Sequence, residues 1–283
     1  MCEGEYRAWR ESARRNTRRG GVIVRESDAA PSLFTADVDY TARGLRFDDE
    51  GLAEALGEQI AGEIVLERDG EGPISIDRVT LAGPGIALNA QGTVAGSENG
   101  FETDTTLSLA AERLERFSEL TGLDLAGAAD LEIDSTIRPL DGIFDLSLSG
   151  STQDLALGIE PLDPYIDGTG DIAIEAARDE TGTRIETLRI ATPQMTATAQ
   201  ADITSGASTA TFDIAVENAG LALDGVEGPA RLTGTAERDA AGVSRADVVA
   251  ELPNGRAEID ATQAAEADGG RITLDVNAAL DDV

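Results

Sequence analysis

Carboxylates are the groups of this chain that could carry out chemistry, because the other usual catalytic side chains are scarce. The 283 residues contain 54 Asp and Glu, no His and a single Cys, Cys2, and all 22 basic residues are Arg. Without His and Lys there is no His-based triad, Schiff base, Walker lysine or usual catalytic zinc site. The single Cys also excludes an intrachain disulfide and a thiolate zinc site.

Paired carboxylates leave one enzyme class to consider, the glycosidases, in which two Asp or Glu side chains flank the scissile bond. In a chain this acidic, some pair of carboxylates lies close by chance. One Trp and three Tyr also leave few rings to stack on sugars. We therefore expect a protein that is not an enzyme and has no catalytic residues.

Calcium binding would be a second use of carboxylates, and segment 163–171 places Asp163, Asp167 and Asp171 among glycines. The spacing matches neither the EF-hand loop nor the G-G-x-G-x-D repeat of calcium-binding β-rolls. We interpret the segment as an acidic turn, and we expect no metal site and no cofactor.

The net charge of −32 restricts the partners of the chain. It argues against nucleic acid, whose phosphates would be repelled, and against adsorption to anionic lipid surfaces. Residues 1–32 differ, since they hold seven Arg and the only Trp, Trp9. We expect a disordered or adventitious leader there and a repetitive β segment over residues 33–283. No apolar run approaches the roughly 20 residues of a membrane helix, and no signal peptide is evident.

Alternation of apolar and polar residues dominates from Leu33 onward and predicts an all-β protein. Turn signals such as Asp69-Gly and Asp141-Gly separate the alternating runs. Helical spacing interrupts the pattern at residues 49–56 and 112–120, where we expect short helices at strand crossings. The predicted strands cover residues 34–40, 60–66, 74–81, 86–94, 105–110, 129–133, 143–148, 155–159, 171–176, 185–190, 195–203, 209–216, 230–236, 247–252, 256–261 and 271–277.

An internal repeat in the second half of the chain indicates stacked supersecondary units. The segment that begins at Ile166 returns at Val226, which aligns Arg178 with Arg238 and Asp179 with Asp239. We call this the Arg-Asp repeat. We expect its two Arg-Asp pairs to occupy equivalent, solvent-facing hairpin ends.

A second repeat, which we call the Pro repeat, links the two halves of the chain. Segment 76–91 parallels segment 185–200, and the alignment places Pro84 opposite Pro193. We interpret each segment as a strand, a turn marked by Pro and a return strand. The two repeats have different offsets, so the repetition is degenerate and unequal in length.

The alternation also predicts which side chains share one face of the sheet. Polar neighbours such as Asp130 and Glu132 would meet water on the opposite face. If the sheet closed on itself, the apolar face would be an ordinary core, whereas a sheet that curled without closing would form an aliphatic groove. The residues predicted to line this face are Leu107, Leu109, Leu131, Ile133, Leu146, Leu148, Ile172 and Ile174.

Four phrases of the sequence, at residues 76–94, 125–133, 146–157 and 177–182, resemble one family. They are similar to TamB, the translocation and assembly module subunit of Gram-negative bacteria, of the alphaproteobacterial type. That family belongs to the AsmA-like, bridge-like lipid-transfer proteins. The resemblance covers roughly residues 33–283. It implies an elongated, repetitive antiparallel β-sheet curled into a groove (a β-taco), with one or two short helices.

The resemblance implies a non-catalytic role in the periplasm. The apolar lining of such a groove carries phospholipid acyl chains from the inner to the outer membrane, or assists outer-membrane protein assembly with an Omp85-type barrel partner similar to TamA. Full members begin with an inner-membrane helix and end in a conserved C-terminal domain. Neither is evident here, so we expect an internal segment of a longer parent protein that is anchored in the inner membrane.

The alternative function is a structural or adhesive β-solenoid segment of an exported surface protein. An adhesin should show repeats of constant length, stacked polar ladders and often calcium-binding turns. The repeats here are unequal and the strand faces are strongly aliphatic, which favours the lipid groove.

Overall fold

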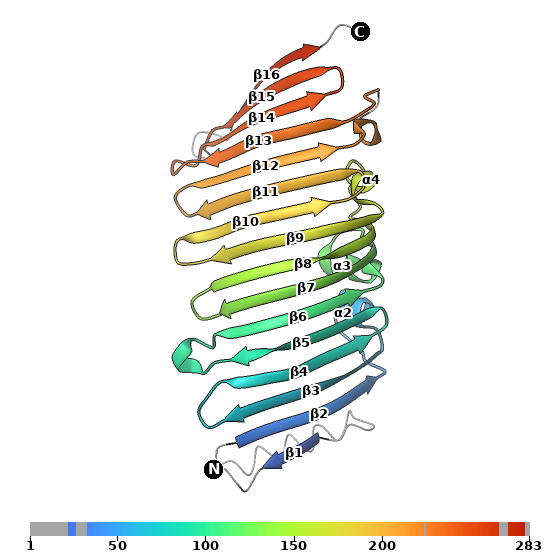
Figure 1. Cartoon of the computed structure of the whole chain (residues 1–283), viewed down its shortest axis with the longest axis vertical. Coiled ribbons are helices and arrows are strands. Elements are labelled where there is room, and N and C mark those ends of the chain that lie inside the picture. Colours follow the sequence, from blue (N-terminus) through green and yellow to red (C-terminus); the bar gives the residue numbers. More distant parts are fainter. Residues whose placement is uncertain (1–21, 27–32, 224, 266–270, 281–283) are drawn as a thin grey trace.

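The structure is a computed structural model that describes residues 22–26, 33–223, 225–265 and 271–280. These residues form one antiparallel sheet of 16 strands, in which each strand pairs with its neighbours in sequence (Figure 1). The first and last of the described strands do not pair with each other, so the described sheet is open. The predicted fold class, an elongated antiparallel β-sheet with few short helices, is therefore confirmed.

The strands are β1 (Val22–Glu26), β2 (Leu33–Arg43), β3 (Gln59–Asp69), β4 (Ile74–Gly83), β5 (Ile86–Val94), β6 (Thr103–Ala111), β7 (Ala126–Arg138), β8 (Ile143–Ala156), β9 (Thr169–Arg178), β10 (Gly182–Ala191), β11 (Met195–Thr204), β12 (Ser208–Val216), β13 (Ala230–Arg238), β14 (Ser244–Leu252), β15 (Gly255–Gln263) and β16 (Ile272–Leu280).

The two long edges of the sheet are built differently. One edge, which we call the hairpin edge, carries the connections from β3 to β4, β5 to β6, β7 to β8, β9 to β10, β11 to β12, β13 to β14 and β15 to β16. Gly70 and Gly142 adopt left-handed backbone angles in these turns, with φ of 62° and 66°, which few side chains other than Gly tolerate. The other edge, which we call the helical edge, carries the helical connections on the right of Figure 1.

The helical edge carries both helical connections and tight turns marked by Pro. Asp49 caps the first helix, since its carboxylate accepts the backbone N–H of Leu52 at 2.8 Å. The helices predicted at residues 49–56 and 112–120 are confirmed. The connections at this edge are α2 (Glu50–Leu56), η2 (Leu114–Phe117) with α3 (Ser118–Thr121), α4 (Asp163–Ile166) and η3 (Ala219–Leu221).

Three short helices were not predicted. α4 has four residues, and η3 and η1 (Ser97–Asn99), which lies at the hairpin edge between β5 and β6, have three each. Helices of one turn or less show no helical period in the sequence, because a period needs at least two turns to repeat.

The Pro repeat marks equivalent irregularities in the sheet. The pairing of β4 with β5 shifts register between Ile76 and Val79, and the pairing of β10 with β11 shifts between Ile185 and Leu188. These positions are aligned in the sequence repeat. Each bulge adds one residue to its strand, so apolar side chains return to the same face after the shift.

The Arg-Asp repeat marks equivalent hairpins. Arg178 is the last residue of β9 and Arg238 the last of β13, and the next residue of each hairpin is Asp179 or Asp239. Both arginines and Asp179 are exposed, whereas Asp239 is half-buried. The prediction that the two Arg-Asp pairs occupy equivalent hairpin ends is confirmed, with Asp239 less exposed than expected.

The structure corrects one predicted strand. Residues 155–159 do not form a strand of their own, because β8 continues without a break to Ala156. Residues 149–153 belong to β8 and pair with β7, and a bulge follows where Asp154 has a left-handed φ of 50°. In addition, β1 lies within residues 1–32 and pairs with β2, so the sheet extends into the segment expected to be a leader. Trp9 lies outside the described residues.

Buried apolar side chains are few, and most of them are Ala. The main cluster contains Tyr165, Ile166, Met195 and Ala197, where α4 packs against β11 at the helical edge. Few described side chains are enclosed, and among the buried apolar ones only Ala55, at 1%, is less than 2% exposed. This follows from the architecture, since a single sheet without a second layer has no enclosed interior.

Candidate functional site

One face of the sheet collects the aliphatic side chains. Directly paired residues of an antiparallel sheet point to the same side. The register links Leu107 to Ile133, Ile133 to Leu148 and Leu148 to Ile174. A parallel line runs through Leu109, Leu131, Gly150 and Ile172, and Leu146 pairs with Ala176. All eight residues predicted to line a groove therefore lie on one side of the sheet, which we call the apolar face.

The side chains of the apolar face are only half-buried. This holds for all eight predicted residues, whereas their polar neighbours on the opposite side, which we call the polar face, are exposed. No second layer of described residues covers the middle of the apolar face. Contiguous apolar surface of this kind is uncommon in monomeric soluble proteins and marks a binding surface. The exposed polar neighbours include Asp130, Glu132, Asp145, Ser147, Asp171 and Glu175.

The apolar face extends well beyond the predicted residues. From Leu107 the same line of paired positions continues toward β2, and from Ile174 it continues to β16. Sequence reasoning did not include these residues, because alternation fixes the face within one strand whereas the match between strands depends on their pairing. In β4 and β10 a bulge also shifts the alternation by one position. The additional residues on this line include Val38, Ile64, Val79, Ala90, Leu188, Ala199, Phe212, Val248, Ile259 and Val276.

Helical connections form a wall along one side of the apolar face. Tyr165 and Ile166 of α4 pack against Met195 and Ala197, whose side chains belong to that face. The Tyr165 hydroxyl lies 3.1 Å from the carbonyl oxygens of Asn218 and Ala219 and donates to this pair of acceptors. Because these residues lie at the start of η3, the Tyr165 side chain ties two helical connections together. At this part of the helical edge the apolar face is therefore bordered by packed helical residues, while the hairpin edge has no such wall among the described residues.

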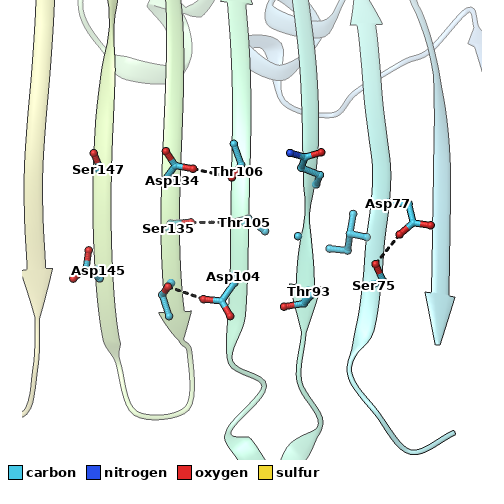
Figure 2. Close-up of a pocket in the computed structure, with 14 residues that line it drawn as sticks. Ser75, Asp77, Thr93, Asp104, Thr105, Thr106, Asp134, Ser135, Asp145 and Ser147 are labelled. Atoms are coloured by element: carbon cyan, nitrogen blue, oxygen red, sulfur yellow. Dashed lines mark hydrogen bonds between the residues drawn. The ribbon is translucent and has the colours of Figure 1, made fainter. Parts of the chain in front are cut away.

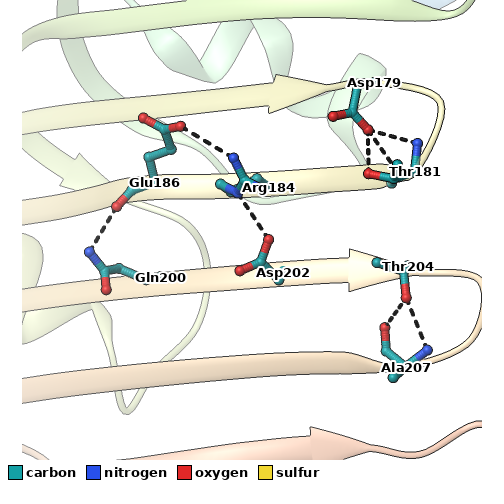
Figure 3. A network of polar contacts seen from close by, with 9 residues as sticks. Asp179, Thr181, Arg184, Glu186, Gln200, Asp202, Thr204 and Ala207 are labelled. Carbon is teal, nitrogen blue, oxygen red and sulfur yellow. Dashed lines mark hydrogen bonds and ion pairs between the residues drawn. The ribbon is translucent and has the colours of Figure 1, made fainter.

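The polar face is organised by cross-strand pairs. Arg184 donates to Asp202 at 3.0 Å, and Arg231 donates through Nε to Asp213 at 2.9 Å (Figure 3 shows the first of these pairs). The hydrogen bond from Arg231 lowers the pKa of Asp213 below its ordinary value. Exposed pairs of this kind contribute little to the overall stability, so their main effect is to favour the register of the strands.

A polar depression of about 660 Å³ lies on the polar face over β4 to β8 (Figure 2). Thr106 donates to Asp134 at 2.7 Å, and Thr136 donates to Asp104 at 2.6 Å. Asp134 and Asp104 therefore each have a hydroxyl partner from the neighbouring strand. The depression is lined by carboxylates and hydroxyls, with no cationic side chain among its described residues. The hydrogen bonds between its hydroxyls and carboxylates are explained by the pairing of neighbouring strands.

The acidic segment considered for calcium does not converge on one point. The Asp163 carboxylate accepts the backbone N–H of Leu157 at 2.9 Å, and the backbone N–H of Asp167 donates to the Asp163 carbonyl at 3.1 Å. Asp171 lies on the polar face, paired with Ser151. Over the described part of the chain, no three His, Cys, Asp or Glu side chains are grouped so that they could hold a metal ion.

Among the described residues, no helix has the length and apolar character needed to cross a membrane. Comparisons with protein families, with curated proteins and with solved structures find no match for this chain. The geometry of the sheet is therefore the basis on which its function is proposed.

Proposed function

We propose that the apolar face shelters phospholipid acyl chains, as a non-catalytic segment of a TamB-like protein. In this proposal the parent protein is periplasmic, is anchored in the inner membrane and moves phospholipid toward the outer membrane in outer-membrane biogenesis. An Omp85-type barrel similar to TamA would be its partner through the parent protein.

The observation that carries the proposal is the continuous, half-buried aliphatic face without a covering layer of described residues. Removing apolar surface from water is favourable by about 25 cal/mol per Å², and acyl chains can lie on a long aliphatic surface without needing hydrogen-bond partners. The helical connections support the same function, because α4 packs against the apolar face and gives an acyl chain a border along which it can lie.

A charge placed on the apolar face tests the proposal. We expect Leu148→Asp to remain folded, because a carboxylate on an uncovered face still reaches water, and to carry much less phospholipid than the wild type. A closed core would instead leave a buried unpaired charge, which costs several kcal/mol and unfolds the protein. Circular dichroism reports the folding, and mass spectrometry of the purified protein reports the bound lipid.

The matched control is Ser149→Asp, which introduces the same charge one residue later on the polar face of β8, where Ser149 is exposed. This variant should keep both its fold and its lipid. A wild-type protein that carries no phospholipid, even after incubation with phospholipid vesicles, would refute the proposal and favour the structural or adhesive alternative.

A further inference from the structure

Arginines recur on the apolar face along the hairpin edge. One line of directly paired positions runs along this edge and includes Arg68 in β3, Arg178 in β9 and Arg238 in β13. These Arg side chains project from the apolar face of the sheet, at the hairpin edge, which lacks the helical wall. A cation at the border of an aliphatic surface is unusual. In a strand the next residue points to the opposite face, so each Arg could have been placed on the polar face by a shift of one position.

Arg178 and Arg238 have no anionic partner in the described structure. Both are exposed, and neither forms an ion pair with any described residue. Arg68 differs, because its guanidinium donates to the carbonyl oxygens of Gly72 at 3.0 Å and Glu71 at 3.4 Å within its own turn. Arg178 and Arg238, which the Arg-Asp repeat aligns, are therefore the arginines on this line whose guanidinium groups are available to bind an anion.

The carboxylates that follow these arginines are engaged elsewhere. The Asp179 side chain accepts the backbone N–H of Thr181 at 2.7 Å and a second bond from its hydroxyl. The Asp239 side chain accepts the backbone N–H of Val243 at 3.0 Å and pairs with Arg245 at 3.2 Å. Neither Asp forms an ion pair with the Arg before it, so the turns leave both guanidinium groups able to bind an external anion.

Beside Arg238 the apolar face is hollowed into a cavity of about 430 Å³. Its lining combines Ala210, Ala236 and Ala246 with the Arg238 side chain and Ile272. The cavity therefore brings an apolar floor and a guanidinium group to the same place. A ligand that fills it needs an apolar tail and an anionic group at one end.

We infer that Arg178 and Arg238 bind the headgroup phosphates of anionic lipids whose acyl chains lie on the apolar face. A guanidinium group matches a phosphate with two parallel hydrogen bonds, which a point charge does not provide. The two arginines are four strands apart, about 19 Å at the usual spacing of strands, so each serves a separate lipid. This inference rests on the proposed lipid-binding function.

The test compares two soluble short-chain lipids on the intact protein by isothermal titration calorimetry. Dioctanoylphosphatidylglycerol and dioctanoylglycerol share their acyl chains, and only the first has a phosphate. We expect the wild type to bind the phosphate lipid roughly tenfold more tightly, which corresponds to about 1.4 kcal/mol. Arg178→Gln combined with Arg238→Gln should remove this preference and leave the binding of dioctanoylglycerol unchanged.

The matched control is Arg189→Gln in β10, an exposed arginine on the polar face that also forms no ion pair with a described residue. It should keep the tenfold preference. Equal binding of both lipids by the wild type, or a preference that survives the double substitution, would overturn the inference while leaving the proposed function in place. Failure to bind either lipid would overturn the proposed function and the inference with it.

Discussion

At the scale of single residues, the turn carboxylates of the two equivalent hairpins show how a short sequence signature acts. Asp179 and Asp239 each accept hydrogen bonds from backbone N–H groups that would otherwise lack a partner in the turn. The hydroxyl and N–H of Thr181 lower the pKa of Asp179, and the N–H of Val243 is the main cause that lowers the pKa of Asp239. The repeated Arg-Asp pair thus encodes a turn as well as an exposed cation.

These lowered pKa values predict acid sensitivity. A folded-state pKa below the unfolded value of about 3.9 means that the charged form stabilises the fold. The contribution is therefore complete above about pH 4 and is lost as the pH falls through the lower, folded-state pKa. We expect Asp179→Ala combined with Asp239→Ala to lower the urea midpoint at pH 7 and to reduce the further loss at acidic pH.

Urea unfolding followed by circular dichroism at several pH values measures this effect. Asp145→Ala is a suitable control, because Asp145 is exposed and its side chain forms no hydrogen bond with a described residue. An equal urea midpoint for the double variant and the wild type at pH 7 would show that the turn bonds do not stabilise the protein.

At the scale of elements, alternation predicted most strands because each strand has one aliphatic and one polar side. It failed in the second half of β8, where two separate strands were predicted although cross-strand pairing continues through residues 149–153. The eight predicted residues on the apolar face were found for the same reason that the strands were. The cationic border was not predicted: alternation from Ile172 and Ile174 places Arg178 on the apolar face, but its alignment with Arg68 and Arg238 along one edge follows only from the pairing between strands.

Three aspartates in line across β14, β15 and β16 conflict with sheet stability. Asp247 pairs directly with Asp260, and Asp260 with Asp275. Their hydrogen bonding and mutual repulsion raise the pKa of Asp260, with Asp247 as the main cause. A pKa that is higher in the folded than in the unfolded state means that the neutral form of Asp260 stabilises the fold. This stabilisation is complete below the pKa of the unfolded state and is lost as the pH rises through the pKa of the folded state. Like charges directly opposite each other destabilise strand pairing.

We therefore expect Asp260→Asn to raise the melting temperature at pH 7 and to have little effect at pH 3, where the wild-type acid is already protonated. Differential scanning calorimetry at both pH values measures the difference. Glu258→Gln is the control on the same strand, since Glu258 pairs with Arg256 at 3.2 Å and its loss should bring no gain. A lower melting temperature for Asp260→Asn at pH 7 would mean that a cation or another partner compensates the three carboxylates.

At the scale of the whole molecule, the strictly sequential strand order makes the sheet almost one-dimensional. Each strand contacts its neighbours in sequence, and the contacts are therefore local. The central strands β7 and β8 are the longest, with 13 and 14 residues, whereas Ile272 and Leu274 of β16 are 69% and 60% exposed. Stability should consequently decrease from the middle of the sheet toward its ends.

Hydrogen exchange followed by mass spectrometry tests this gradient. We expect the backbone amides of β7 to β9 to exchange most slowly and those of β16 to exchange fastest, because an end strand can separate without disturbing the others. Peptides from α4 provide an internal reference for the helical wall. Equal protection of all strands would instead indicate one cooperative unit.

The same strand order has a consequence for how such a protein changes in evolution. Sixteen strands spaced by about 4.8 Å give the sheet a length of roughly 70 Å. One unit of the Arg-Asp repeat equals four strands, from β9 to β13, and so adds about 19 Å. Duplicating or deleting one such block changes the length of the molecule while every remaining strand keeps its neighbours. The number of repeats therefore acts as a ruler, by which selection can adjust the span between two anchoring points without redesigning the fold.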